Sequence, residues 1–466
     1  MNIKNINLRQ ILFYLIIFFK NICKKYLPFW FRCRIRVITS SIIDIIIFLL
    51  IFYLFKININ LNFLAILGTW SLSSYIMGRY NFGKSKNIDK IKYKRESIKN
   101  LFFTIFISLL SILIIFLIDG NNSISSSIFI KLILILSSYG LISYLIQYLF
   151  IKTLYIYDID NSNMVYLGNL KTFKDIELYI KENKLKLNLI KIDDIDELLS
   201  RKIKVQGLII DGIKNFSPEQ LKKIEVIHKK GLKVYSLLDW CENFLERIPV
   251  NHLNHDYVFG RNYFKLNNPK ELKLKRIGDI LFSIILLTAT LPLIIISSFL
   301  IFIEDKGPIF YSQNRTGYFQ EIIKIWKLRT MYVDSEKNGS QWSKRNDPRI
   351  TKVGKFLRVL RIDELPQLIS VLKGDMSLIG PRPERPEIDN SLIKKIPFYE
   401  LRYTIRPGLS GWAQVNYPYG ASIKDSEEKL SFDLYYLANF SFLLDFVILL
   451  KTIKLIFNGR GAIANQ

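Results

Sequence analysis

The chain has few cysteines and few histidines for its length. Its 466 residues include three histidines and three cysteines, Cys23, Cys33 and Cys241, which show no pairing pattern. This shortage excludes a disulfide framework and fits the reducing cytosolic side of a membrane. His252, His255 and Asp256 follow Cys241 closely, but a zinc site needs four well-placed ligands, so we do not expect zinc there.

Acidic residues are also scarce relative to basic ones. The chain has 40 acidic and 66 basic residues, a formal net charge of +26, and half of its residues are hydrophobic. A nucleic-acid binder would explain the charge but not the long apolar runs, so we expect no nucleic-acid partner. Anionic membrane lipids and diphosphate substrates would explain both features.

Four long segments contain few charged residues, namely 36–55, 60–78, 97–118 and 128–150. Each has about the ~20 residues that cross a bilayer. Basic residues precede the first segment and separate the second from the third, whereas the other two connections carry almost none. This asymmetry predicts that both termini face the cytoplasm. We therefore expect a membrane α-helical bundle in residues 1–152.

Two further features of this bundle region leave alternatives open. The apolar stretch 6–19 is short and no small-residue cleavage site follows it, which favours an interfacial helix over a signal segment. Asp44 lies inside the first predicted span, where a carboxylate is a functional candidate. The alternative, a polar contact between helices near the helix end, is favoured.

The central residues, 153–265, alternate between short apolar runs and amphipathic stretches. The apolar runs predict strands near residues 164–170, 187–192, 207–211 and 232–238. With helices between them, this pattern predicts a parallel, Rossmann-like α/β domain. A dinucleotide site would need a G-x-G-x-x-G run after the first strand, and the chain offers only Gly168, so we expect no bound nucleotide.

The apolar run 277–303 is long enough to span a bilayer, yet basic residues flank it on both sides. Both flanks therefore look cytoplasmic. Pro292 interrupts the run and removes a helical N–H donor. We expect a re-entrant helix that enters and leaves by the same leaflet, with a kinked full span as the alternative.

The most informative run of the sequence is RIDELPQLISVLKGDMSLIGPRP, residues 361–383. It places Asp363 and Glu364 side by side where a helix is expected to begin. Pro366 is tolerated only in a first helical turn, and Gly374 suits the residue that ends the helix. Backbone N–H groups and the helix dipole would keep both carboxylates ionised, so that they could act as nucleophile or metal ligand.

The same run ends in a rigid turn. Pro381 and Pro383 flank Arg382 and restrict its backbone. A guanidinium presented in this way matches phosphate oxygens with two parallel hydrogen bonds. We therefore expect Arg382 to bind phosphate.

From about Lys275 to the C-terminus the chain closely resembles the bacterial sugar transferase family, the monotopic phosphoglycosyl transferases. The matching blocks, in order, are KRIGD (275–279), GPIFYSQNRTG (307–317), KLRTM (327–331), Asp363-Glu364, KGDMSLIGPRP (373–383), RPGLSGWAQVN (406–416) and FDLYYLANFSFLLD (432–445). The resemblance implies a mostly α-helical catalytic domain over residues 266–466, with a helix-break-helix at 277–303.

The resemblance also implies a reaction. A sugar-1-phosphate moves from a UDP-sugar to undecaprenyl phosphate, which begins capsule, exopolysaccharide or O-antigen synthesis. Asp363 would attack the donor and form an aspartyl–phosphosugar intermediate. Glu364 looks like the Mg²⁺ partner, although Asp363 could also contact the metal. This places a multi-pass protein among the lipids of the bacterial inner membrane, with its catalytic domain on the cytoplasmic face.

Further basic residues match the family pattern. Lys327 and Arg329 would bind donor phosphate or contact lipid headgroups, and Arg361 has the same two alternatives. Arg406 would bind phosphate or serve the fold. Trp412 could contact uridine, although a core position is favoured.

Some questions stay open at this level. Residues 441–457 fit an interfacial helix or a packed core helix equally well. A homodimer through the membrane helices or the central domain fits the chain, but no feature requires it. Competing functions are a polytopic transferase, which would need more spans and aspartate-rich loops, and a non-catalytic membrane scaffold that regulates polysaccharide synthesis.

Overall fold

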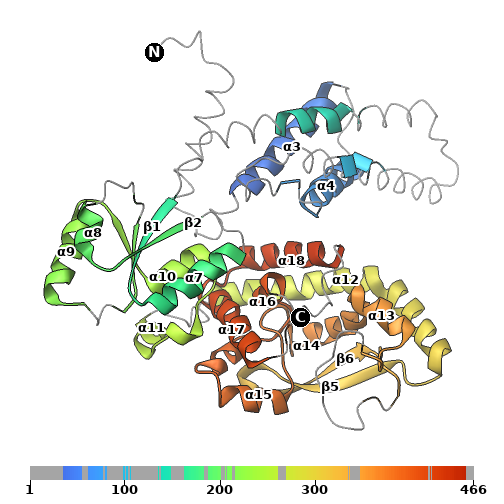
Figure 1. Ribbon diagram of the computed structural model, residues 1–466. Coiled ribbons are helices and arrows are strands. Elements are labelled where there is room, and N and C mark those ends of the chain that lie inside the picture. Colours follow the sequence, from blue (N-terminus) through green and yellow to red (C-terminus); the bar gives the residue numbers. More distant parts are fainter. Residues whose placement is uncertain are drawn as a thin grey trace. The chain divides into compact units, whose positions relative to one another are not determined.

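The computed structural model of the chain places two compact units, Met1–Asn243 and Phe244–Gln466 (Figure 1). It describes residues 35–54, 61–76, 79–80, 98–99, 101–102, 105, 135, 138–147, 162–182, 187–200, 205, 207–212, 216–260, 269–333, 335, 347–417, 420 and 422–457. The two units are described separately below. The division into three domains, 1–152, 153–265 and 266–466, stays a prediction.

The first described elements of this unit are two apolar helices, α3 (Ile35–Leu54) and α4 (Leu61–Ile76). They coincide with the first two predicted spans, 36–55 and 60–78. The other two predicted spans lie largely outside the described residues, although 138–147 are helical, and stretch 6–19 lies outside them entirely. Several aromatic and aliphatic side chains form a buried core between these helices, including Phe48, Trp70 and Tyr139. A complete membrane bundle therefore stays a prediction.

Asp44 lies at the centre of a buried polar cluster between these helices. Its carboxylate pairs with the Arg79 guanidinium at 3.2 Å and accepts hydrogen bonds from Trp70 Nε1 at 3.1 Å and Tyr80 Oη at 2.7 Å. Gln147 Nε2 donates to the other carboxylate oxygen at 3.1 Å. Because every contact joins segments far apart in the sequence, the geometry fits the polar inter-helix contact rather than a reactive group.

The same unit contains a four-stranded parallel sheet. Its strands are β1 (Ser162–Leu167), β2 (Leu187–Ile192), β3 (Gly207–Ile210) and β4 (Lys233–Ser236), in the order β2-β1-β3-β4. Helices α7 (Leu170–Glu182), α8 (Ile195–Ser200) and α9 (Pro218–Lys229) connect the strands, and a short α10 (Leu237–Trp240) follows β4. The predicted parallel sheet is confirmed, whereas the Rossmann-like label stays a prediction.

The second unit is mostly helical and contains two small two-stranded sheets. In chain order, its elements from the end of the first unit are η3 (Cys241–Leu245), η4 (Val250–His252), α11 (His255–Gly260), α12 (Pro269–Asp305), β5 (Phe310–Thr316), η6 (Tyr318–Gln320), β6 (Ile322–Leu328), α13 (Lys352–Val359), η7 (Ile362–Gln367), α14 (Leu368–Lys373), β7 (Ser377–Ile379), α15 (Pro386–Ile393), η8 (Tyr399–Thr404), β8 (Gly408–Ser410), α16 (Trp412–Asn416), α17 (Ile423–Ala438) and α18 (Phe442–Phe457). Strands β5 and β6 form an antiparallel hairpin, and β7 and β8 pair in parallel.

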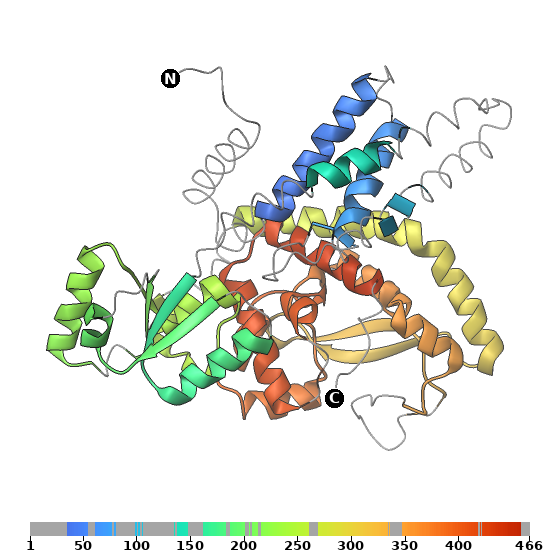
Figure 2. The same ribbon diagram turned by 45° about the horizontal axis from the view of Figure 1, so that its top comes forward.

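Helix α12 is the one described helix that is long and apolar enough to cross a membrane, judged by length and composition. It is a continuous helix of 37 residues, about 55 Å at 1.5 Å per residue. Figure 2 shows that it bends along its course, and Pro292, which lies inside it, supplies a cause for a bend. The predicted break at 277–303 is therefore a bend within one helix, and the re-entrant path stays a prediction.

The two arms of α12 are fixed to different parts of the second unit. In the C-terminal arm, Ile294 and Ile301 belong to the same buried cluster as Leu328 of β6 and Ile362 of η7. In the N-terminal arm, Arg276 donates to the carbonyl oxygens at the end of α14. Asp279 accepts two hydrogen bonds from β7, each of 3.0 Å.

Lys275 anchors the N-terminal arm through a buried network. Its Nζ atom lies 2.7 Å from the Asp445 carboxylate of α18 and donates to the Ile379 carbonyl oxygen at 2.8 Å. Tyr436 Oη donates to the second Asp445 oxygen at 2.7 Å. Burial raises the pKa of Asp445, although Lys275 opposes this shift. Helix α18 is therefore a packed helix on this face, with Leu444 and Ile448 fully buried.

This network generates a stability prediction. Lys275→Met leaves the buried Asp445 carboxylate without its cation, so we expect the protein to lose about 3–5 kcal/mol of stability. The double variant Lys275→Met/Asp445→Leu should recover most of the loss, because it removes both charges. Thermal unfolding of detergent-solubilised protein measures both effects, and a double variant no more stable than the single one would contradict the prediction.

Candidate functional site

The Asp363-Glu364 pair lies at the start of a helical segment, as the sequence predicts, but the first turn is a 3₁₀ turn. Turn η7 carries both carboxylates and runs directly into α14, which ends at Gly374 with a φ of 100°. Pro366 explains the tighter turn, because its ring is incompatible with a regular α-helical interior. Arg361 precedes the turn in the left-handed region, with a φ of 59°. The predicted helix end at Gly374 is confirmed.

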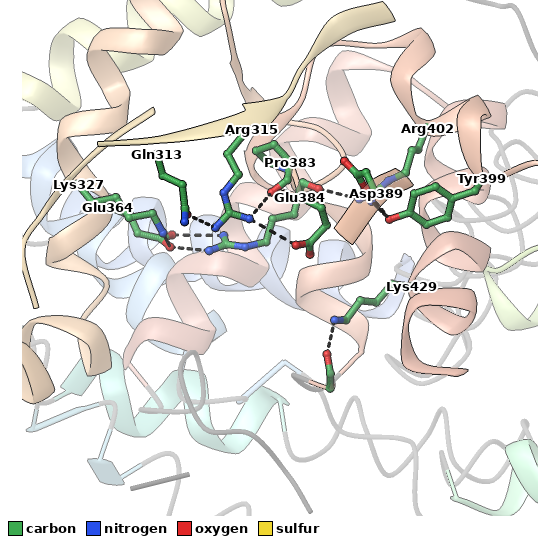
Figure 3. Close-up of polar contacts among 12 residues, drawn as sticks. Gln313, Arg315, Lys327, Glu364, Pro383, Glu384, Asp389, Tyr399, Arg402 and Lys429 are labelled. Carbon is green, nitrogen blue, oxygen red and sulfur yellow. Dashed lines mark hydrogen bonds and ion pairs between the residues drawn. The ribbon is translucent and has the colours of Figure 1, made fainter. Parts of the chain in front are cut away.

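Three cations surround Glu364. Arg382 Nη2 lies 2.6 Å from Oε1, Lys327 Nζ lies 2.9 Å from the same oxygen, and Arg361 Nη1 lies 3.2 Å from Oε2. Figure 3 shows Lys327 pointing at this carboxylate from β6. The sequence predicts that backbone N–H groups and the helix dipole keep Glu364 ionised. In the structure, the cationic side chains make these contacts. Burial alone would raise the pKa of Glu364, but the three cations hold that pKa well below its usual range.

Asp363 lies next to this cluster in a different electrostatic state. Its side chain is buried, and its Oδ1 atom has no hydrogen-bond partner among the described residues. Burial raises the pKa of Asp363 to about 6, with a further contribution from the neighbouring Glu364 charge. Above that pH the carboxylate is ionised and weakly solvated, which makes it reactive toward an electrophile.

A magnesium ion at these carboxylates would need substrate oxygens to complete its coordination. The described residues contain no group of three or more His, Cys, Asp or Glu side chains arranged to hold a metal ion. Magnesium usually takes only one or two carboxylates together with substrate phosphates, so a larger cluster is not needed. The Asp363 carboxylate could supply one ligand. Both Glu364 oxygens already contact cations, so a metal at Glu364 would have to share them.

The loop that carries Arg382 lies against strand β8. Gly380 N–H donates to the Ser410 carbonyl oxygen at 2.8 Å, and Gly408 N–H donates to that of Pro381 at 2.9 Å. The two backbones are so close that a Cβ atom on Gly408 would lie 2.0 Å from the Gly380 nitrogen. Pro381 and Pro383 are both buried. The two prolines predict a rigid loop around Arg382, and the hydrogen bonds to β8 hold this loop further in place.

Arg315 is a site residue that sequence reasoning missed. It lies on β5 and donates to the Pro383 carbonyl oxygen at 3.2 Å and to the Glu384 carboxylate at 3.4 Å (Figure 3). Gln313 shares the same strand face and accepts from Arg315 at 2.7 Å. The sequence could have indicated Arg315, because Gln313 and Arg315 in the block GPIFYSQNRTG are two residues apart. In a strand, this spacing places both side chains on the same face.

The other predicted phosphate ligands lie outside the Glu364 cluster. Arg329 pairs with Asp305 at the end of α12. Arg406 is exposed and lies 5.8 Å from the ring centroid of Tyr318. Trp412 is buried and donates from Nε1 to the Glu246 carbonyl oxygen at 3.0 Å, as expected for a core residue. Of the predicted basic residues, the structure therefore brings Lys327, Arg361 and Arg382 together.

Comparisons with known proteins agree with this geometry. The family model described as "Bacterial sugar transferase" matches residues 270–459. The chain is 42% identical over 231 residues to a UDP-N-acetylgalactosamine-undecaprenyl-phosphate N-acetylgalactosaminephosphotransferase of Aeromonas hydrophila, covering 50% of this chain and 54% of the relative. It is 49% identical over 131 residues to a putative undecaprenyl-phosphate N-acetylgalactosaminyl 1-phosphate transferase of Bacillus subtilis, covering 28% of this chain and 73% of the relative.

A third relative, a UDP-glucose:undecaprenyl-phosphate glucose-1-phosphate transferase of Escherichia coli, is 36% identical over 191 residues. The match covers 41% of this chain and 41% of the relative. The match thus spans about half the length of the Aeromonas relative and less of the Escherichia one. Every matched residue of the family model lies in the second unit, which holds Asp363, Glu364 and the cation cluster. The chain belongs to the bacterial sugar transferase family.

Proposed function

We propose that this chain transfers a sugar-1-phosphate from a UDP-sugar to undecaprenyl phosphate and releases UMP. The observation that carries the proposal is the buried Asp363 Oδ1 atom, which has no hydrogen-bond partner among the residues that the structure describes and lies beside a carboxylate that gathers three cations. The relatives suggest the substrates: two are named for an N-acetylgalactosamine transfer and one for a glucose transfer, all to undecaprenyl phosphate. The sugar itself is not specified by these residues.

The three cations around Glu364 would reduce the repulsion between the attacking carboxylate and the donor diphosphate. A carboxylate that approaches a diphosphate is repelled unless positive charge lies between or around them. Lys327, Arg361 and Arg382 are already gathered at Glu364, so an arriving diphosphate would exchange one anionic partner for another. Glu364 therefore keeps three cations in place before the donor binds. Mg²⁺, when bound, would neutralise further charge on the diphosphate oxygens.

The transfer then follows in two balanced steps. Asp363 Oδ1 attacks the β-phosphorus of the UDP-sugar, the bond from that phosphorus to the bridging oxygen breaks, and UMP leaves with the electron pair. A phosphate oxygen of undecaprenyl phosphate next attacks the same phosphorus. The bond to Asp363 breaks and the carboxylate is restored. The product is undecaprenyl-diphosphate-sugar, the lipid-linked start of a capsule, exopolysaccharide or O-antigen chain.

The apolar helix α12 suits a lipid-linked acceptor. Its most apolar stretch has a mean hydropathy of 2.6 and is largely exposed at the protein surface. A protein held at the cytoplasmic face of the inner membrane would meet both substrates there, since UDP-sugars are cytoplasmic and the acceptor phosphate lies at the headgroup level. Helix α12 would then keep η7 close to the acceptor without extracting the prenyl chain.

Asp363→Asn tests the proposed nucleophile. We expect this variant to lose UMP release by at least about a thousandfold, because the carboxamide is a poor nucleophile. Wild-type protein incubated with labelled UDP-sugar, without acceptor, and quenched in acid should carry the label. Asp375→Asn is the matched control, since Asp375 is exposed and close in the chain. Normal turnover by Asp363→Asn would remove Asp363 as the nucleophile.

The raised pKa of Asp363 predicts a pH dependence. Only the ionised carboxylate attacks, so the single-turnover rate of UMP release should fall about tenfold per pH unit below pH 6 and level off above it. Glu364 should not add a second step in this range, because its pKa is lowered. Rapid-quench measurements between pH 4.5 and 8 give the profile, and a rate that is constant down to pH 4.5 would contradict it.

The same pKa shift predicts a stability difference. Because the folded pKa lies above the ordinary value of 3.8, this group's contribution to stability is complete below that value and is lost as pH rises through 6. Asp363→Asn removes the loss, so the variant should gain about 1–3 kcal/mol relative to wild type above pH 6 and little near pH 4. Thermal unfolding with EDTA at both pH values tests the sign; a variant less stable than wild type at pH 8 would reverse it.

A further inference from the structure

The loop around Arg382 is held at four consecutive carbonyl oxygens, and backbone groups hold the outer two. Gly408 N–H donates to the Pro381 oxygen at 2.9 Å, and Thr316 N–H donates to the Glu384 oxygen at 3.0 Å. These bonds tie the two ends of the loop to β8 and β5. Pro381 and Pro383 have no N–H group, so they add no backbone hydrogen bonds of their own to hold the loop. The carbonyl oxygens of Arg382 and Pro383, in the middle of the loop, still need donors.

Two guanidinium groups supply those donors. Arg402 Nη2 donates to the carbonyl oxygen of Arg382 itself at 2.7 Å, and Arg315 Nη1 donates to that of Pro383 at 3.2 Å. The two arginines come from η8 and β5, on separate segments. Of the two, Arg402 binds the backbone of Arg382, the residue whose side chain pairs with Glu364.

Arg402 is itself fixed by a buried network. Its guanidinium lies 3.2 Å from the Asp433 carboxylate of α17 and 3.9 Å from that of Asp389 on α15. Its Nη1 atom donates to Tyr399 Oη, which donates in turn to Asp389 at 3.1 Å (Figure 3). All four side chains are buried, and Arg402 exposes 7% of its surface. A buried cation with two carboxylate partners has little freedom to change its direction.

We propose that Arg402 is a positioning residue that sets the direction of the Arg382 side chain toward the donor diphosphate. The proposal rests on the proposed function and adds a residue to it. The Arg402 guanidinium is engaged by Tyr399, Asp433 and the Arg382 carbonyl oxygen, so we assign its effect to that carbonyl contact rather than to substrate binding. A forked guanidinium recognises phosphate only when its plane is aligned, and a displacement of about 1 Å at such a group can cost about a hundredfold in rate.

The kinetic test compares Arg402→Gln in two backgrounds. In the wild-type background we expect kcat/KM for the UDP-sugar to fall about 10- to 100-fold. In the Arg382→Gln background the same change should cost less than about threefold, because the group that Arg402 positions is already absent. A residue that only stabilises the fold would cost the same factor in both backgrounds, and that outcome would overturn the proposal.

Arg247→Gln is the matched control. Arg247 also pairs with a carboxylate of α17, since its Nη1 atom lies 2.5 Å from Glu428, and its guanidinium lies 5.7 Å from the ring centroid of Phe432 on the same helix. This variant should keep kcat/KM within about threefold of wild type while lowering thermal stability. Arg402→Lys keeps the charge near Asp433 and serves where Arg402→Gln fails to fold; it should recover only part of the lost kcat/KM, because an ammonium cannot reach both partners in the same geometry. Full activity of Arg402→Lys would contradict the proposal.

A second readout does not depend on catalysis. Amide hydrogen exchange of the peptide that spans residues 380–388 should be about tenfold faster in Arg402→Gln than in wild type, because the loop loses an anchor. Exchange in α14 should be unchanged. Unaltered loop exchange would overturn the positioning role, whereas absence of UMP release by the wild-type protein would overturn the proposed function and leave the exchange result standing.

Discussion

The site depends on one carboxylate and the three cations that it gathers. Lys327, Arg361 and Arg382 come from β6, the residue before η7 and the loop after β7, and they meet at Glu364. Without the charge of Glu364, three positive groups in a poorly hydrated space would repel one another and separate. The carboxylate thus assembles, before any substrate arrives, the charge arrangement that the proposed diphosphate donor would require. Preorganisation of this kind avoids the cost of gathering charges during the reaction.

Adjacent residues with the same chemistry are thereby driven into different states. Glu364 keeps a lowered pKa because cations outweigh the effect of its burial, whereas Asp363, one residue earlier, has a raised pKa because burial and its neighbour's charge dominate. A pair of carboxylates whose environments separate their pKa values is a frequent mark of divided roles. In this protein one carboxylate organises charge, and its neighbour has an oxygen without a hydrogen-bond partner in the described part of the chain.

The part of the site that is local in sequence could be predicted, and the part made by distant contacts could not. Asp363, Glu364, Gly374 and the turn around Arg382 occur within one run, where proline and glycine rules apply directly. The 3₁₀ first turn was missed because capping patterns do not distinguish it from an α-helical turn. Arg402 lies 20 positions after Arg382, and its importance comes from a carbonyl contact that no spacing rule encodes. Likewise, Arg329 matches a basic motif but faces Asp305.

The bent helix α12 has a mechanical consequence. Its C-terminal arm packs Ile294 and Ile301 against Ile362, which is the residue immediately before Asp363, while its N-terminal arm is fixed through Lys275 and Asp279. Any force that straightens this helix would therefore pull on the turn that holds Asp363. If α12 lies in a bilayer, acyl-chain length and lateral pressure would supply such a force, and lipid composition would be physically coupled to this turn.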